Sequence, residues 1–180
     1  DLQLIVFDER GAGNGWLQPA GPLREALPRR VPPSSIVLYN AAQPSTPLPG
    51  HRARRGLAGA ASLADWWAGA APTFATIEAL RGRPVLAAAG VARPQRFFSM
   101  LREAGLAIVE HPLPDHHDFA TLAWPAGTSD VIVTEKDAVK IRPERIGGVR
   151  VWVAALDFGF PAAFERELLA LLPPRPHRTA

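Results

Sequence analysis

Short runs of apolar residues recur along the chain and alternate with segments whose apolar positions are spaced like one face of a helix. The runs LQLIVF (residues 2–7) and SIVLYN (residues 35–40) predict two buried strands. From Arg83 onward four more strands are predicted, within PVLAAAG, LAIVEHPL, DVIVTEKD and VRVWVAAL. Strands that alternate with helices predict an α/β fold with a largely parallel sheet.

Helical patterns lie between and after these runs. RPQRFFSMLREAGL predicts an amphipathic helix with Pro94 at its start and Gly105 at its end. We expect a second helix after Phe119 and a short one that carries Lys136 and Lys140. The last helix is predicted over PAAFERELLALL, with an apolar stripe through Phe164, Leu168, Leu169 and Leu172.

The segment between the first strands and Arg83 is patterned more weakly. Residues 41–56 are rich in proline, glycine and arginine, which is typical of a domain boundary or linker. SLADWWAGAAPTF predicts a short helix around Trp66 and Trp67, followed by an extended strand. The uncharged run that begins after Arg30 is long enough to cross a bilayer, but its five prolines exclude a transmembrane helix.

The composition narrows the classes of function. The chain has no cysteine, which excludes a disulfide scaffold, a cysteine nucleophile and a thiolate-bound metal. Lys136 and Lys140 are the only lysines, so arginine supplies 18 of the 20 basic residues and favours an anionic partner. A formal net charge of +3 over 180 residues is too weak to indicate nucleic acid. The chain opens on Asp1 and enters a strand at once, so we expect residues upstream of it.

DERGAGNGW follows the first predicted strand and resembles the start of a dinucleotide-binding loop. Gly11 and Gly13 fit the first two glycines of G-x-G-x-x-G, but Trp16 stands where the third is needed. Pro19 and Pro22 then block the helix whose N-terminus would hold a pyrophosphate. Neither lysine follows a glycine, so the chain contains no G-x-x-x-x-G-K-[ST] loop of its own.

LQPAGPLRE predicts a rigid turn that ends in an adjacent cation and anion. Pro19 and Pro22 fix the backbone, and Gly21 allows a close backbone approach. Two interpretations remain open for the Arg24–Glu25 pair. It is either a solvated pair on a surface turn or a site at which Glu25 binds a hard cation and Arg24 a phosphate.

LPDHHDF places two histidines between two aspartates. On an extended segment His116 and His117 would point to opposite faces, which disfavours their binding one metal together. The pairing of Asp115 with His116 suits general acid/base chemistry, with the carboxylate orienting the imidazole. The alternative is a turn in which Asp118 caps the following helix, and the two interpretations are compatible.

VTEKDAVK predicts a polar cluster where a strand ends and a helix begins. Thr134, Glu135, Lys136 and Asp137 stand at the carboxyl end of the strand, where ligands bind in open α/β sheets. Capping of the helix by Thr134 explains part of the pattern equally well.

In this order and spacing, GNGWLQPAGPLRE, AAAGVARPQRFFSMLREAGL, LPDHHDF and VTEKDAVK resemble the tetraacyldisaccharide 4′-kinase family of lipid A biosynthesis. The resemblance runs from Asp1 to about Leu172. It implies an ATP- and Mg²⁺-dependent kinase that phosphorylates the 4′-hydroxyl of a tetraacylated disaccharide phosphate. Such an enzyme would lie peripherally at the cytoplasmic face of the bacterial inner membrane.

The resemblance also implies an architecture and a set of site residues. The family's Walker A loop and membrane-associating N-terminal helix would precede Asp1, so the chain resembles the C-terminal part of the kinase. His116 resembles the family histidine that forms the catalytic dyad with an aspartate of the part expected before Asp1, and Asp115 beside it is a further catalytic candidate. Glu25 resembles the acidic residue near Mg²⁺ and ATP, with Arg24 as its neighbour. His117 aligns where the family tolerates tyrosine, which argues against proton transfer by His117.

The expected fold is an incomplete α/β/α domain of the P-loop kinase type and a smaller C-terminal α/β/α domain, joined by a β linker. We expect residues 1–55 in the first domain, residues 56–82 in a linker region and residues 83–180 in the smaller domain. The last helix is a candidate to pack back on the first domain. Two alternatives remain, a non-catalytic α/β ligand-binding module and a metal-dependent phosphohydrolase that uses the His-His-Asp cluster.

Overall fold

The computed structural model describes residues 2–121 and 123–172. The chain forms two compact units. The first unit contains the residues up to Arg55 together with those from Phe158 onward, and the second is Gly56–Asp157. Each unit has a hydrophobic core of its own.

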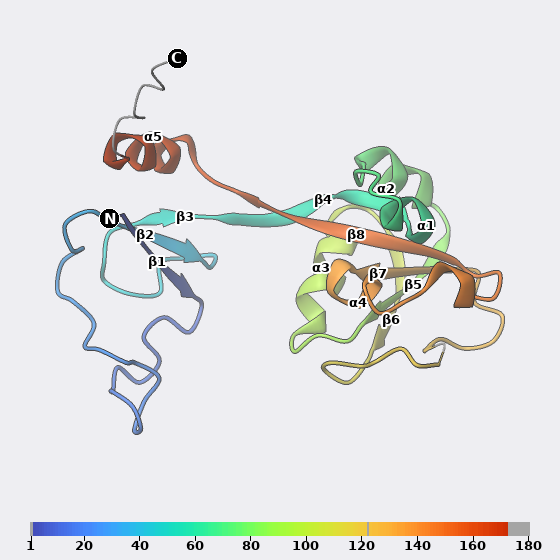
Figure 1. Ribbon diagram of the computed structural model, residues 1–180, viewed down its shortest axis with the longest axis horizontal. Helices are drawn as coiled ribbons and strands as arrows, with labels where there is room; N and C mark the ends of the chain where they lie inside the picture. The colour runs from blue at the N-terminus through green and yellow to red at the C-terminus, as the bar shows by residue number, and fades with distance from the viewer. Residues whose placement is uncertain (1, 122, 173–180) are drawn as a thin grey trace, which may run out of the picture. The chain divides into compact units, whose positions relative to one another are not determined.

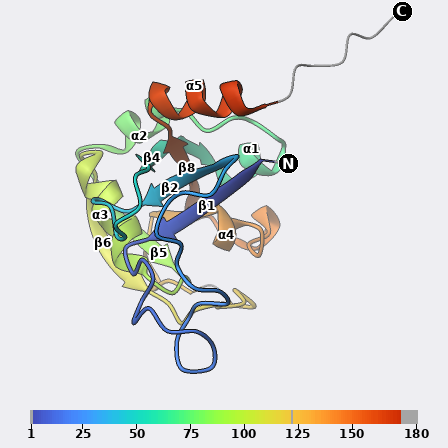
Figure 2. The same cartoon turned by 90° about the vertical axis from the view of Figure 1, so that its left-hand side faces the viewer.

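The first unit is built on a parallel three-stranded sheet. Its strands β1 (Gln3–Asp8), β2 (Ser35–Asn40) and β3 (His51–Arg52) lie in that order, so β2 is central (Figure 2). Successive side chains of β2 point to opposite faces. Ile36 and Leu38 enter one cluster of buried side chains, and Val37 and Tyr39 enter another. The two strands predicted from residues 2–7 and 35–40 are confirmed.

Helix α5 (Ala162–Leu171) covers one face of this sheet. Phe164 is buried against Ile36 and Leu38, and Leu168 packs beside it. The helix predicted over PAAFERELLALL is therefore confirmed, but its apolar stripe is narrower than expected, because Leu169 is 68% exposed. Five residues along an α-helix correspond to a rotation of about 140° from Phe164, which turns Leu169 away from the sheet.

The second unit contains a five-stranded sheet in the order β4-β8-β7-β5-β6. Its strands are β4 (Arg54–Ser62), β5 (Pro84–Ala89), β6 (Ala107–Pro112), β7 (Asp130–Thr134) and β8 (Arg150–Gly159). Strands β6, β5, β7 and β8 pair in parallel, as predicted. β4 and β8 are neighbours, and each contains a boundary between the two units, so two adjacent strands connect the units (Figure 1).

Helices cover both faces of this sheet. Residues of α2 (Phe74–Leu80) and α3 (Pro94–Glu103) pack with Ile132 in one cluster, and residues of α1 (Leu63–Trp67) and α4 (Glu135–Ala138) pack with Val131 and Val133 in the other. A short 3₁₀ turn, η1, spans Pro143–Arg145. The second unit therefore has the α/β/α layering expected for the fold class, and the predicted α/β fold is confirmed.

Two expectations for local structure are wrong. The extended strand expected after Trp67 does not form, since residues 68–73 contain only an isolated antiparallel bridge between Thr73 and Ala60. α2 then begins at Phe74, because the Thr73 hydroxyl accepts a hydrogen bond from the Thr76 N–H and caps the helix. No helix follows Phe119 within residues 119–121 and 123–129. There Phe119 has a left-handed backbone conformation, with φ of 55°, so the bond of the Ala120 N–H to Asp118 Oδ1 closes a turn and begins no helix. Asp118 is consequently not the cap of a helix.

The helices of the expected linker and of the chain's end fall in different units. Residues 56–82 contain α1 and α2, whose residues Leu63, Ile77 and Leu80 are buried in the second unit. α5 belongs to the first unit.

No helix within residues 2–121 and 123–172 has both the length and the apolar composition needed to cross a membrane.

Candidate active site

The carboxyl ends of β5, β6 and β7 meet at one edge of the second sheet, because these strands are parallel neighbours (Figure 1). The loop after β6 is bonded to the end of β5: the Leu113 N–H donates to the Ala89 carbonyl at 3.0 Å, and the His116 N–H donates to the Gly90 carbonyl at 3.2 Å. This edge is where open α/β sheets bind their ligands. The loop with both histidines is therefore fixed at a ligand-binding position of the fold.

Asp137 joins the start of α4 to the end of β5 at this edge, from a fully buried position. Its Oδ2 accepts hydrogen bonds from the Gly90 N–H at 3.1 Å and from the Thr134 hydroxyl at 2.8 Å. Its Oδ1 has no hydrogen-bond partner among the described residues. The space around Gly90 is tight, since a Cβ there would lie 3.1 Å from Asp137 Oδ1 and 3.1 Å from His117 Cβ. Asp137 thereby positions Gly90, whose carbonyl holds His116.

His116 adopts a left-handed backbone conformation, with φ of 63°. The expectation that both histidines lie on an extended segment is therefore wrong, since His116 stands at the turn of the loop. Its side chain is 76% exposed, and its Nε2 lies 3.7 Å from Asp115 Oδ2. The imidazole is thus open to solvent, with a carboxylate within reach of it.

Asp115 is held by a lysine from the TEKD segment. Lys136 Nζ donates to Asp115 Oδ1 at 3.2 Å, and the same oxygen accepts the His116 N–H at 3.0 Å. The hydrogen bond from Lys136 holds the pKa of Asp115 below its ordinary value. Asp115 is therefore ionised at neutral pH and presents a carboxylate to the neighbouring imidazole.

His117 is held in a different way from His116. Its Nδ1 accepts the Phe119 N–H at 2.9 Å, and its ring packs on Phe119 with centroids 4.7 Å apart. Lys140 Nζ donates to the His117 carbonyl at 2.7 Å, and the His117 side chain is only 22% exposed. One ring nitrogen of His117 is thus occupied by the backbone, whereas the ring of His116 projects into solvent.

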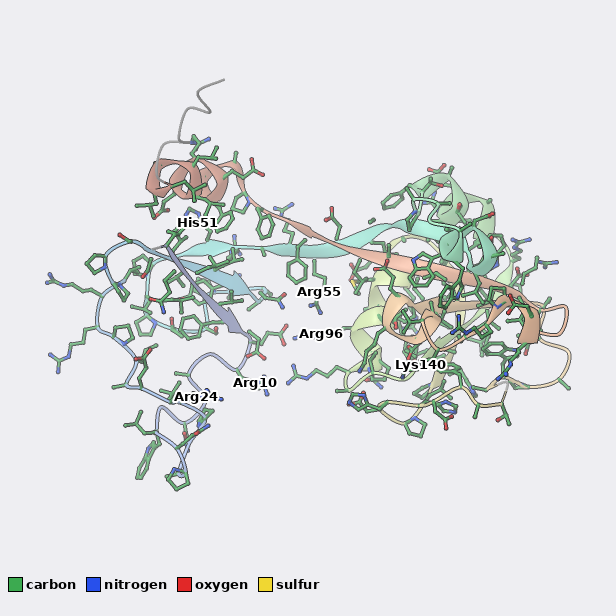
Figure 3. The ribbon with its side chains drawn as sticks, viewed as in Figure 1. Arg10, Arg24, His51, Arg55, Arg96 and Lys140 are labelled. Carbon is green, nitrogen blue, oxygen red and sulfur yellow. The ribbon has the colours of Figure 1, made fainter. Side chains whose placement is uncertain are left out.

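Arg24 and Glu25 belong to the first unit and follow a tightly folded turn. Asn14 Oδ1 accepts the Trp16 N–H at 3.1 Å, and the Gln18–Pro19 peptide bond is cis. A Cβ at Gly21 would lie 2.3 Å from the Trp16 carbonyl oxygen, so the close backbone approach expected there is confirmed. The Arg24 and Glu25 side chains are both exposed (Figure 3 labels Arg24).

Metal-ligating groups are sparse in the described residues. Within residues 2–121 and 123–172 no three His, Asp or Glu side chains gather closely enough to hold a metal ion. The His-His-Asp cluster therefore provides no three-residue metal site in this part of the chain. Glu25 offers one exposed carboxylate as a ligand.

The structure brings Asp115 and His116 together with Lys136 at one sheet edge, while Arg24 and Glu25 lie in the other unit. Sequence reasoning missed the roles of Gly90, Asp137 and Lys140 in holding this loop. Two signals pointed to them: the glycine that ends PVLAAAG and the polar TEKD run at the end of a strand. Neither signal shows which loop these residues hold, because those contacts join segments 20 to 50 residues apart in the sequence.

The fold and this sheet edge define an α/β protein with candidate acid/base residues where parallel strands end. The profile of the family described as tetraacyldisaccharide-1-P 4′-kinase matches residues 1–173, and the chain belongs to this family. The tetraacyldisaccharide 4′-kinase of Leptothrix cholodnii is 58% identical over 97% of this chain and 51% of its own length. That of Methylibium petroleiphilum is 56% identical over 99% of this chain and 51% of its own length.

A solved structure has the same fold. The structure of LpxK from Aquifex aeolicus in complex with ATP matches with a TM-score of 0.63 and 20% identity, over 94% of this chain and 51% of that one. The chain thus spans about half the length of the relatives that it matches.

Proposed function

We propose that the full-length protein is a kinase that transfers the γ-phosphoryl group of ATP to the 4′-hydroxyl of a tetraacyldisaccharide 1-phosphate. The family match over residues 1–173 carries this proposal. ATP in the similar Aquifex aeolicus structure supports ATP as the donor. The chain itself contains no G-x-x-x-x-G-K-[ST] loop, so it contributes other parts of the machinery.

We assign the proton-handling role to His116. Phosphoryl transfer to a hydroxyl requires a group that orients the nucleophile and accepts its proton. The exposed imidazole of His116 is available for this, and its backbone is fixed by the bond to Gly90. Asp115, kept ionised by Lys136, stabilises the imidazolium that forms when His116 accepts the proton. His117 packs on Phe119 and supports the loop.

We assign Arg24 and Glu25 to the nucleotide. Mg²⁺ is commonly bound by one or two carboxylates together with substrate phosphates, so a single exposed carboxylate such as Glu25 suits it. When bound, the ion neutralises charge on the transferring phosphate. The guanidinium of Arg24 can bind phosphate oxygens through two parallel hydrogen bonds.

The proposed substrate favours a location at a lipid surface. A tetraacylated disaccharide is anchored in a bilayer by its acyl chains, so the enzyme must meet it there. We propose peripheral association with the cytoplasmic face of the inner membrane, favoured by an arginine-rich surface that attracts anionic lipid. No nucleic acid is involved in this proposal.

The two neighbouring histidines provide the test. In the full-length protein, His116→Ala should lower kcat by roughly 10²- to 10⁴-fold and leave ATP binding largely unchanged, because a dyad histidine acts in the transition state. His117→Tyr should cost far less. The measurement is the transfer of labelled γ-phosphate from ATP to tetraacyldisaccharide 1-phosphate at saturating substrates, with circular dichroism to verify folding.

Each outcome decides between the hypotheses. A larger loss of kcat in His117→Tyr than in His116→Ala would mean that His117, and not His116, is the catalytic histidine. Similar losses from both variants, together with loss of a bound metal, would favour the phosphohydrolase. A folded full-length protein with no transfer activity would favour the hypothesis of a non-catalytic ligand-binding module.

A further inference from the structure

Two adjacent tryptophans at the end of α1, Trp66 and Trp67, have no role in the proposed function. Trp66 Nε1 donates a hydrogen bond to Glu135 Oε1 at 3.3 Å, and Trp67 Nε1 donates one to the Ile141 carbonyl at 3.0 Å. The first acceptor belongs to the first residue of α4, and the second lies just beyond the end of this helix. The two indoles are thus bonded to both ends of one short segment, residues 135–141, which we call the α4 segment.

The α4 segment in turn holds the loop that carries both histidines. Lys136 Nζ donates to Asp115 Oδ1 at 3.2 Å, and Lys140 Nζ donates to the His117 carbonyl at 2.7 Å (Figure 3 labels Lys140). Asp137 Oδ2 accepts the backbone N–H of the residue that follows β5, and the carbonyl of that residue is bonded to the same loop. Three side chains from one segment therefore fix the loop, and a shift of the segment displaces their bonds together.

The position of the α4 segment depends on contacts from neighbouring elements. α4 has only four residues, and a helix this short is not stable through its own hydrogen bonds. β7 leads directly into α4, so the strand fixes the beginning of the segment and not its end. α1 supplies a further constraint, because its first residue, Leu63, is buried against the sheet. Ser62 Oγ caps α1 by accepting the Asp65 N–H at 3.1 Å.

Burial alone does not account for the tryptophan pair. Trp67 is 39% exposed, and Trp66 is only partly buried beside Ala138 and Ile141. The two rings meet edge to face with centroids 5.8 Å apart, and the Arg142 guanidinium lies 4.7 Å from the centroid of the Trp67 ring. Phenylalanine rings would make similar apolar contacts, but they have no N–H donor. The directed bonds of the indoles to the α4 segment are therefore what tryptophan adds at these positions.

From these contacts we infer that Trp66 and Trp67 are positioning residues, which hold the histidine loop (residues 113–119), and with it His116, through the α4 segment. The inference rests on the proposed role of His116 in phosphoryl transfer. A displacement of about 1 Å in a catalytic site can lower turnover roughly 100-fold. Loss of the indole bonds should therefore be measurable in kcat.

The test removes the indole N–H groups and keeps aromatic rings. In the full-length protein, Trp66→Phe combined with Trp67→Phe should lower kcat roughly 10- to 100-fold and leave the KM for ATP nearly unchanged. The double variant should also speed amide hydrogen exchange in peptides that cover the histidine loop, by roughly 2- to 10-fold for each lost bond. Each single variant should show the same changes to a smaller degree, so the test remains decisive if the double variant does not fold.

Trp152→Phe is the matched control. It also removes one indole bond to a carboxylate, that of Trp152 Nε1 to Asp130 Oδ1 at 2.9 Å, but at the opposite end of β7. This variant should lower the melting temperature and leave both kcat and the exchange of the histidine loop near the wild-type values.

Unchanged exchange of the histidine loop in both single variants would overturn the inference. So would a loss of kcat in Trp152→Phe as large as the losses in those variants, because the tryptophans would then contribute only general stability. If the wild type transfers no phosphate, the proposed function is wrong, and the exchange measurement still decides whether the tryptophans hold the loop.

Discussion

Asp130 is the charged residue with the most strongly shifted pKa among those described. Its buried carboxylate accepts hydrogen bonds from Arg150 Nε at 2.8 Å and from Trp152 Nε1 at 2.9 Å, and Arg83 lies 3.7 Å away. The hydrogen bonds from Arg150 contribute most to lowering its pKa to about 2. Asp130 thereby fixes the start of β7 to β8, at the end of β7 opposite the candidate site.

Asp130 is predicted to stabilise the second unit in a pH-dependent way. Because its folded pKa lies below the unfolded value of 3.8, its contribution is complete above that value and is lost as the pH falls toward about 2. Asp130→Asn should lower the free energy of unfolding by about 2 kcal/mol at pH 7. Urea unfolding at pH 7 and pH 2.5 measures this, and the difference from wild type should narrow at the lower pH.

A matched control separates this effect from a general change of charge. Asp157 is exposed, so Asp157→Asn should leave the free energy of unfolding nearly unchanged at both pH values. Equal stabilities of Asp130→Asn and the wild type at pH 7 would contradict the role assigned to this carboxylate.

The role of a single residue was predictable from the sequence where it depends on that residue's own chemistry and its immediate neighbours. The need for glycine at position 21 followed from the PAGP turn, and the backbone contacts confirm it. The conformation of His116 was not predictable, because its positive φ is stabilised by the bond of its N–H to the carbonyl of Gly90, which directly follows β5 and is distant in sequence. The partners of Asp137 were hidden for the same reason.

Among the elements, the strands were the most predictable. β2 and β7 coincide with apolar runs that a parallel sheet buries on both faces, so the pattern of burial and the pattern of sequence agree there. β3 and β4 were not predicted, because their sequences, HR and RRGLAGAAS, contain no such run. Short segments between strands were less predictable. The helix expected after Phe119 is absent from the described part of residues 119–129, because Phe119 has a left-handed backbone conformation, with φ of 55°, which a right-handed helix does not contain.

The junction of β5 with the histidine loop gives a prediction for this element. A methyl group at Gly90 would lie 3.1 Å from Asp137 Oδ1 and 3.3 Å from the Pro114 carbonyl oxygen, so the loop must shift by a few tenths of an ångström. Because small displacements of catalytic groups reduce turnover, Gly90→Ala should lower kcat of the full-length protein roughly tenfold. The KM for ATP should stay nearly unchanged.

The measurement is kcat and KM for both substrates, together with the melting temperature. Gly56→Ala in β4 is the control, since a Cβ at Gly56 would meet nothing within 4 Å. This variant should leave kcat, KM and the melting temperature unchanged. A Gly90→Ala variant with unchanged kcat would show that the position of this loop does not limit the reaction.

At the scale of the whole molecule, the family was accessible from the sequence, whereas the expected domain bounds came from the resemblance and not from any local pattern. PAGPLRE, PDHH and TEKD are specific in combination, and the family match over residues 1–173 confirms the resemblance. The grouping of α5 with residues up to Arg55 depends on contacts such as that of His51 Nε2 with Glu167 Oε2, at 2.6 Å. These partners are 116 residues apart, and no local pattern links them.

The last prediction concerns what residues 1–180 do when produced alone. Kinases of the P-loop type hold the β- and γ-phosphates of ATP with the backbone amides and the lysine of a G-x-x-x-x-G-K-[ST] loop. This chain contains no such loop, so it should neither hydrolyse ATP nor phosphorylate tetraacyldisaccharide 1-phosphate, whatever the state of His116. The assay is the transfer of labelled γ-phosphate, with the full-length protein as the positive control and circular dichroism to verify folding. ATP-dependent phosphorylation of the lipid by this chain alone would show that its own residues suffice to hold the nucleotide, and the division of labour proposed between His116 and the phosphate-binding loop would be wrong.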